Sequence, residues 1–237
     1  MRMRPDEVTS PSAQDSLVRS AAEVAGGPQG RYAAPRSWRR VGAVLVGLSS
    51  VPLALGVLER GHCISAGWNT PDQFWHACFS DLTTTYAGTG LSSGPSAYLF
   101  GMADAATPSQ PPLTGLIMTG VAALVPDAPL DERMRWYFAL WAVLAAVLVS
   151  VVVWMTTASV PRHPVRAAQV ALSPLVALTL FVAPDVVGVA LVSGALLAWG
   201  RRRPPLAGVL LGLAISARTY PLVILAALLF VCLRGGR

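Results

Sequence analysis

The sequence predicts an all-α, polytopic membrane protein with about six transmembrane helices and one further helix on the outer membrane face. Three observations lead to this fold class. Charged residues make up only 13% of the 237 residues, whereas soluble domains carry about 25%. Hydrophobic residues make up 54%. Long apolar blocks recur from Val41 onward, which is typical of helical membrane proteins.

The chain begins with a polar segment and continues as one transmembrane domain. Residues 1–35 are rich in Ser, Pro, Ala, Gly and charge, without an apolar period, and are predicted to form a disordered cytoplasmic tail. Residues 36–237 form the transmembrane domain. The net charge of +6 does not indicate nucleic acid, because the basic residues border apolar segments. Membrane lipid is therefore the expected partner.

Three apolar blocks form the first part of the transmembrane domain. Residues 41–58 and 136–155 each have the length of one membrane-spanning helix. The block between them, residues 111–125, has 15 residues, fewer than the roughly 17 that a span needs. We therefore expect it to lie as an interfacial helix within a large outer loop, residues 59–135.

Two longer blocks, residues 167–199 and 205–233, follow. At 1.5 Å per residue, 33 residues would extend about 50 Å, whereas the hydrocarbon core is about 30 Å thick. Each block is therefore predicted to be a hairpin of two helices whose turn is drawn slightly into the outer face of the bilayer. Pro184 and Pro221 lie where these hairpins would break.

The arginines favour one orientation of these spans. If residues 111–125 do not cross and the N-terminus is cytoplasmic, 14 of the 18 arginines lie inside, all except Arg60, Arg133, Arg135 and Arg218. If the block crosses, the division becomes 10 to 8. The positive-inside rule selects the first arrangement. The acidic residues were not used for this choice, and eight of the 12 then lie outside: Glu59, Asp72, Asp81, Asp104, Asp127, Asp131, Glu132 and Asp185.

Three ionisable residues are expected near the outer membrane face: Asp81, Asp185 and Arg218. An ionisable group near hydrocarbon costs about 2.5 to 3.5 kcal/mol on insertion scales and therefore indicates function. A carboxylate can accept a proton from a hydroxyl nucleophile, and an arginine can hold a phosphate. The structural alternatives are that Asp81 or Asp185 caps a helix and that Arg218 reaches lipid headgroups.

The chain has three cysteines. Cys63 and Cys78 share the outer loop in an oxidising compartment, so a disulfide that closes this 16-residue segment is predicted. The alternative is two unpaired thiols, because pairing needs a geometry that the sequence does not give. Cys232 lies in the last apolar block and is expected to pack there.

The order of these features resembles the N-terminal half of the C-type glycosyltransferase superfamily, and most of all glycosyltransferase family 87 (DUF2029), the actinobacterial mannosyltransferase-like membrane proteins. The resemblance covers roughly residues 40–237. It is carried by "CFSDLTTTYAGTGL", by "PPLTGLIM", by "LSPLVALTLFVAPDVVGVALVSGALLAWGRRRPPLAGVLLGLAISARTYPLVIL" and by the closing "LRGGR". Family members usually continue for several more spans, so the resemblance implies an N-terminal half or a truncated form.

The resemblance implies an enzyme that moves a mannose-type hexose from a polyprenyl-phosphate donor to a lipid or glycan acceptor, with inversion, at the outer face of the plasma membrane. By position, Asp81 corresponds to the catalytic base, Arg218 to the residue that binds the donor phosphate, and Asp185 to a second acidic site residue. No cofactor and no metal are implied. The family usually has lysine in place of Arg218 and an Asn-Trp-Asp type turn in place of "APD".

Two other classes of protein remain open. The first is a catalytically inactive or truncated membrane homologue with a structural role, which would tolerate neutral residues at Asp81 and Arg218. The second is a transporter, which would show internal repeat symmetry and paired broken helices. The sequence has no second half related to the first, so the transporter is the less favoured of the two.

Overall fold

The computed structural model describes residues 37–94, 110–161 and 163–234. Within these ranges the chain forms helices and no strands, which confirms the all-α prediction. The predicted tail, residues 1–35, lies outside the described residues, as do Asp104 and Arg162.

The first predicted span is two helices in succession, α2 (Trp38–Leu48) and α3 (Ser50–Glu59). The two helices meet at Ser49, which is buried and donates its hydroxyl hydrogen to the carbonyl of Val46 over 2.7 Å. Pro52 explains the interruption, because proline has no N–H to donate to the carbonyl four residues earlier.

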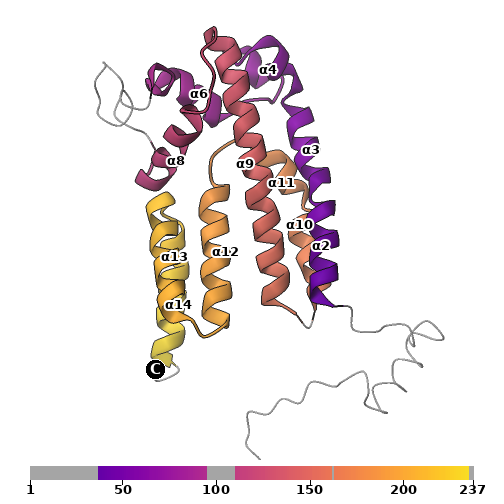
Figure 1. Ribbon diagram of the computed structural model, residues 1–237, viewed down its shortest axis with the longest axis vertical. Coiled ribbons are helices and arrows are strands. Elements are labelled where there is room, and N and C mark those ends of the chain that lie inside the picture. The colour runs from indigo at the N-terminus through magenta and orange to yellow at the C-terminus, as the bar shows by residue number, and fades with distance from the viewer. Residues whose placement is uncertain (1–36, 95–109, 162, 235–237) are drawn as a thin grey trace, which may run out of the picture.

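The longest helix, α9 (Leu130–Ser159), runs through the length of the molecule and contacts α2 and α12 (Val186–Gly200) (Figure 1). The buried side chains of α9 include Tyr137, Phe138 and Trp141. This aromatic cluster forms the core at the end where the outer-loop helices gather.

The hairpin predicted over residues 205–233 is present as α13 (Pro204–Ala217) and α14 (Pro221–Arg234). Pro204 and Pro221 each begin a helix, where the missing N–H costs nothing. The α12 helix packs against α13 along its length (Figure 1).

The other predicted hairpin, residues 167–199, is less regular than expected. Its second limb is α12, which begins two residues after Pro184, close to the predicted break. Its first limb is divided into η3 (Pro164–Ala167), α10 (Ala168–Ala171) and α11 (Pro174–Thr179). Pro174 accounts for this division, since proline ends the helix before it and starts the next.

Most of the outer loop lies at one end of the molecule. It contains α4 (Gly61–Ala66), α5 (Asp72–Trp75), α6 (Asp81–Gly88), η2 (Leu91–Ser93) and α8 (Pro112–Ala122) (Figure 1). The helix predicted over residues 111–125 is therefore present as α8, with slightly shorter bounds. The α8 helix contacts α9 and α13.

Among the residues that the structure describes, two helices are long and apolar enough to cross a membrane: Trp38–Glu59, taken as one unit, and Leu130–Ser159. Only 28% and 33% of their most apolar windows are buried inside the protein, so most of this apolar surface is left uncovered. The helices α12, α13 and α14 are apolar but have 14 or 15 residues. They therefore extend about 21 to 22 Å at 1.5 Å per residue, less than a hydrocarbon core of about 30 Å.

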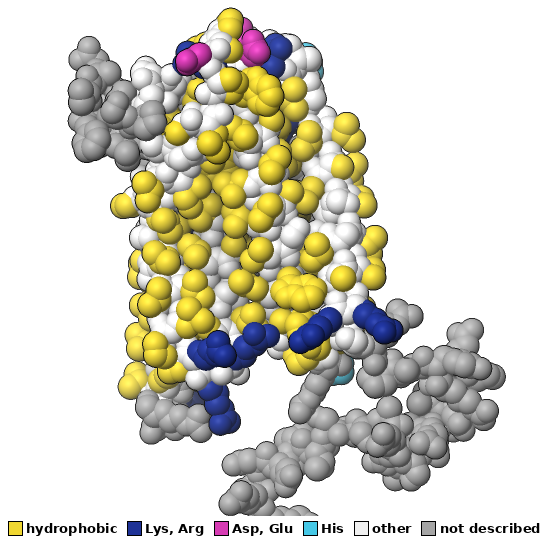
Figure 2. Space-filling view, in the orientation of Figure 1, with side chains coloured by type: hydrophobic (Ala, Val, Ile, Leu, Met, Phe, Trp, Pro, Cys, Tyr) yellow, Lys and Arg dark blue, Asp and Glu magenta, His cyan; other side chains and the backbone are white. Residues whose placement is uncertain are grey.

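Charged side chains gather at the two ends of the molecule. Figure 2 shows a row of basic side chains at one end, acidic side chains with some basic ones at the other, and apolar side chains between. The first end carries the turn between α12 and α13, with Arg201, Arg202 and Arg203. We call the opposite end, which holds α4, α6 and α8, the acidic end.

Candidate functional site at the acidic end

Asp81 is the first residue of α6 and is half-buried. Its carboxylate accepts hydrogen bonds from the side-chain amide of Gln110 (3.0 Å) and from the hydroxyl of Thr85 (3.3 Å). A carboxylate in the first turn of a helix is stabilised by the helix macrodipole. The α6 helix has no side-chain cap hydrogen bond. Asp81 therefore does not act as a helix cap.

The backbone around Asp81 is bound to the turn that precedes α12. The N–H of Asp81 donates to the carbonyl of Val182 (2.7 Å), and the buried hydroxyl of Ser80 donates to the carbonyl of Phe181 (2.6 Å). These bonds hold α6 against the segment that leads into Asp185. The side chain of Asp81 takes no part in them and stays available for other contacts.

Arg60 also contacts the segment before α12, through Leu178 and Phe181. Its guanidinium is buried and donates to the carbonyls of Leu178 (3.0 Å) and Gly56 (3.2 Å) and to the carboxylate of Glu59 (2.6 Å). It also lies 5.9 Å from the ring centre of Phe181. A buried charge is tolerated when it is paired and hydrogen-bonded. Arg60 therefore connects the end of α3 to α11.

Asp185 and Arg218 form an ion pair, with 2.5 Å between Oδ1 of Asp185 and Nε of Arg218. The contact is ionic and lacks the alignment of an N–H···O hydrogen bond. Asp185 precedes the first residue of α12 but makes no side-chain cap hydrogen bond. Its partner is Arg218, so the capping alternative does not describe it.

Arg218 contacts Asp185 through Nε, which is only one of its three guanidinium nitrogens. Its side chain is 24% exposed, compared with 56% for Asp185. Among the described residues, the two terminal nitrogens of its guanidinium have no polar partner. A guanidinium with free N–H groups can bind a phosphate in two places at once.

Thr114, in α8, positions the residue before Arg218. Its buried hydroxyl donates to the carbonyl of Ala217 over 2.7 Å. Because Gln110, four residues earlier, donates to Asp81, the segment that contains α8 connects Asp81 to the end of α13. Tyr220 follows in the next turn and packs its hydroxyl over Gly188 at the start of α12.

These contacts form a closed ring at the acidic end. Asp81 is bound to Gln110, the α8 segment to Ala217, Arg218 to Asp185, and the turn before Asp185 to Ser80 and Asp81. The structure therefore brings the three predicted site residues into one network, although Asp81 does not contact the ion pair directly in any hydrogen bond or salt bridge of the described residues.

Sequence reasoning missed three members of this network, Ser80, Gln110 and Thr114, and also missed Arg60 beside it. Ser80 had a local signal, because serine immediately before a helix is a common helix start. Gln110 and Thr114 had none, since their partners lie far away in the chain.

Cys63 and Cys78 are joined in a disulfide, and both are fully buried. The bridge encloses the second part of α4 and all of α5, and ends three residues before Asp81. Cys232, in α14, is a free cysteine.

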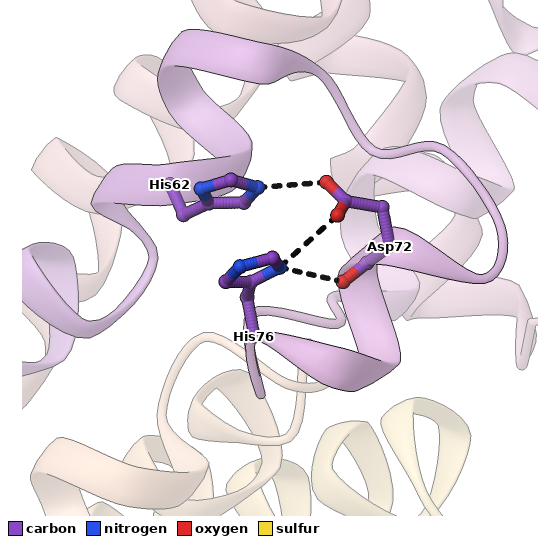
Figure 3. A group of neighbouring side chains, drawn as sticks. All are labelled: His62, Asp72 and His76. Carbon is purple, nitrogen blue, oxygen red and sulfur yellow. Dashed lines mark hydrogen bonds and ion pairs between the residues drawn. The ribbon is translucent and has the colours of Figure 1, made fainter.

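Within the disulfide-closed segment, and just before it, three side chains meet: His62, Asp72 and His76 (Figure 3). Nε2 of His62 lies 2.7 Å from Oδ2 of Asp72, and Nδ1 of His76 lies 3.1 Å from Oδ1. The hydrogen bond with His62 is the largest of the influences that hold the pKa of Asp72 below its usual value. The sequence analysis did not single out these residues.

Two grooves lie away from this network. One, of about 450 Å³, is between α3 and α11 and is lined mostly by apolar residues, with Glu59 at its edge. The other, of about 400 Å³, lies near the N-terminus of α2 and includes Trp38 and Arg201. Neither groove is lined by Asp81, Asp185 or Arg218.

The chain matches no protein-family model, no curated protein and no solved structure. The resemblance to glycosyltransferase family 87 therefore stays a prediction from the sequence motifs.

Proposed function

We propose that the protein is an integral membrane glycosyltransferase. It moves a mannose-type hexose from a polyprenyl-phosphate donor to a lipid or glycan acceptor at the outer face of the plasma membrane, with inversion. The observation that supports this most is the ring of contacts that links the Asp81 carboxylate to the Asp185–Arg218 ion pair at the acidic end.

In this proposal Asp81 is the general base. As the oxygen of the acceptor hydroxyl attacks the anomeric carbon, its proton passes to the Asp81 carboxylate, and the bond between that carbon and the phosphate oxygen breaks. The electron pair of this bond leaves with the polyprenyl phosphate. Proton removal by a positioned side chain typically contributes about 10²- to 10⁴-fold, and the half-buried position of Asp81 leaves it open to an acceptor.

Arg218 stabilises the departing phosphate. The two terminal nitrogens of its guanidinium, which have no polar partner among the described residues, support this role, because a leaving phosphate needs little protonation but needs its charge held. Asp185 keeps the guanidinium in place through Nε. No cofactor takes part in this reaction, and the lipid-linked sugar is the donor substrate.

The membrane arrangement that goes with this proposal is the six-span topology with a cytoplasmic N-terminus. Its support is the separation of charge between the two ends of the molecule, with exposed apolar side chains between them (Figure 2). Exposed leucines and valines recur on α3, α9 and α14, as expected of surfaces that face lipid. The α8 helix would then lie along the outer membrane face.

A second candidate is an inactive homologue with a structural role, and one observation favours it. Asp185 already neutralises part of the charge of Arg218. If the ion pair serves only to join α12 to α13, replacement of Arg218 should reduce stability without any effect on a donor.

The experiment that separates the two candidates measures sugar transfer by the chain in lipid vesicles, with polyprenyl-phosphate mannose as donor and membrane lipid extract as acceptor. Wild-type protein should transfer mannose, and Arg218→Gln should lower kcat/KM for the donor by about tenfold or more, the usual cost of losing a charged hydrogen bond of 1.5 to 3 kcal/mol. Arg234→Gln, at the other end of the molecule, is the matched control and should leave kcat/KM unchanged. Absence of transfer by the wild-type chain would favour the structural candidate.

A further inference from the structure

A second group of chemically active side chains lies at the acidic end, outside the network around Asp81. His62, in α4, and His76, just after α5, stack their imidazole rings with centres 3.6 Å apart and 16° between the planes. Both rings turn a nitrogen toward the carboxylate of Asp72, which lies to one side of the stacked pair (Figure 3). One ligand atom from each of the three residues can be chosen such that all three atoms lie within 4.8 Å of one another.

The backbone that carries these three residues is fixed. His62 is next to Cys63 and His76 is two residues before Cys78, so the disulfide holds both histidines from outside the site. The guanidinium of Arg135, on α9, donates to the carbonyl of Ser65 in α4 over 3.1 Å. When the backbone already holds the ligand side chains in place, less conformational entropy is lost as an ion binds.

We propose that His62, Asp72 and His76 bind a divalent transition-metal ion of the Zn²⁺ class. Two imidazoles and one carboxylate, with water in the fourth position, are a common zinc ligand set. The side chains are 38% to 47% exposed, so an ion can enter and keep a water molecule. This proposal does not depend on the proposed glycosyltransferase activity.

The distances suit such an ion after small movements of the side chains. Zinc lies about 2.0 to 2.2 Å from nitrogen and oxygen ligands, so two ligands of a tetrahedral site are about 3.3 Å apart. The separations of 2.7 Å and 3.1 Å from Asp72 to the two histidines are close to this value. Both cysteines of this segment are in the disulfide. The ligand set therefore favours zinc and its neighbours over ions that need thiolates, and imidazole disfavours Ca²⁺ and Mg²⁺.

The alternative without a metal is that Asp72 serves only as a hydrogen-bond partner of two surface histidines. That arrangement would need no ion and would bind none in particular. The sequence supplies a control for this alternative, because its remaining histidine, His163, is exposed and lies by η3 at the opposite end of the molecule.

Isothermal titration of the detergent-solubilised full chain with ZnCl₂ tests the proposal, in a protein without an added polyhistidine tag and in a buffer that does not bind zinc. Wild-type protein and His163→Gln should bind one zinc ion with the same affinity. His62→Gln, His76→Gln and Asp72→Asn should each weaken binding at least about tenfold, because even the loss of a residue that only supports a metal ligand costs 10- to 100-fold. Titration with Co²⁺ should give the visible absorption of a tetrahedral cobalt site in the wild type and in His163→Gln only.

Any one of three results would overturn the proposal. The first is that wild-type protein takes up no zinc. The second is that the three ligand variants bind zinc and cobalt as the wild type does, which would place the ion elsewhere. Circular dichroism of Asp72→Asn, which keeps the shape of the side chain, separates loss of the ligand from loss of the fold. An Asp72→Asn protein that folds and still gives the tetrahedral cobalt spectrum also contradicts the assignment.

Discussion

Arg218 and Asp185 form an ion pair between the end of α13 and the start of α12. Each charge also complements the dipole of its own helix, since the carboxylate lies at an N-terminus and the guanidinium at a C-terminus. Exposed ion pairs contribute only about 0 to 1 kcal/mol, and the Asp185 side chain is 56% exposed. The pair is therefore better suited to orienting Arg218 than to stabilising the fold.

The hydroxyl of Thr114 should matter more for stability than the ion pair does. Thr114→Val leaves the buried carbonyl of Ala217 without its donor, which should lower the free energy of unfolding by about 1 to 3 kcal/mol. Thr119→Val, in the same helix, is the matched control. Thr119 donates to the carbonyl of Gly115 within α8, and its replacement should cost about 1 kcal/mol or less. Denaturant unfolding in detergent measures both; equal losses would show that the contact with Ala217 carries no special weight.

The close approach of α3 to α11 depends on Gly56. A Cβ atom at this position would lie 2.7 Å from the carbonyl oxygen of Ala177 and 3.1 Å from the ring of Phe181. Gly56→Ala should therefore separate the two helices and lower stability by about 1 to 3 kcal/mol, the usual cost of overpacking. Gly47→Ala has no neighbour within 4 Å and should be neutral or stabilising by up to about 1 kcal/mol. If Gly56→Ala melts at the wild-type temperature, α11 does not pack as described.

The disulfide should contribute to stability through the segment that it closes. Replacement of both Cys63 and Cys78 by serine removes a cross-link across 15 positions, which should lower the free energy of unfolding by about 3 kcal/mol. Cys232→Ser, in α14, is the control for the loss of a thiol and should have a smaller effect. Mass spectrometry of non-reduced peptides should detect the bridge in the wild type, and two alkylatable thiols there would contradict the structure.

Some of this architecture could be predicted from the sequence because its causes are local. Pro184 and Pro221 lie at helix breaks whatever surrounds them, and the outer-loop helix starts at Pro112 for the same reason. Pro52 is an equally local signal for the interruption at Ser49, but the sequence prediction had one continuous span over residues 41–58. The division of α10 from α11 at Pro174 was missed in the same way.

The ring of contacts could not be predicted, because its members meet only through the tertiary fold. Ser80 donates to a carbonyl 101 positions later and Thr114 to one 103 positions later. Arg60, beside the ring, likewise donates to a carbonyl 118 positions later. The cluster of His62, Asp72 and His76 depends in turn on how the disulfide-closed segment folds back on itself. Asp81, Asp185 and Arg218 were identified from charge in an apolar setting, without their partners.

The six-span topology predicts which end of the molecule faces outward. Single cysteines placed at Asp127 and Asp104 should react in intact cells with a thiol reagent that cannot cross the membrane, in a protein that carries Cys232→Ala. A cysteine at Arg202 should react only after the membrane is permeabilised. Asp104 lies outside the described residues, whereas Asp127 and Arg202 are exposed. Labelling of position 202 alone in intact cells would reverse the proposed orientation.

Replacements of Asp81 and of its neighbour Ser80 should distinguish a catalytic role of the Asp81 carboxylate from a structural role of this part of the chain. The backbone N–H of Asp81 binds Val182, and this contact survives the replacement of the side chain. Asp81→Asn also keeps an oxygen that can accept from Gln110. It should therefore leave stability nearly unchanged. Ser80→Ala removes the buried donor to Phe181 and should cost about 1 to 3 kcal/mol while the Asp81 carboxylate remains.

The most direct test is the initial rate of mannose transfer from polyprenyl-phosphate mannose by Asp81→Asn, compared with wild type and Ser80→Ala at equal amounts of folded protein. If Asp81 is the general base, the rate of Asp81→Asn should fall by at least about 10²-fold, and that of Ser80→Ala should stay within a few-fold of wild type. A wild-type rate for Asp81→Asn would show that the base is another residue and would contradict the proposed mechanism.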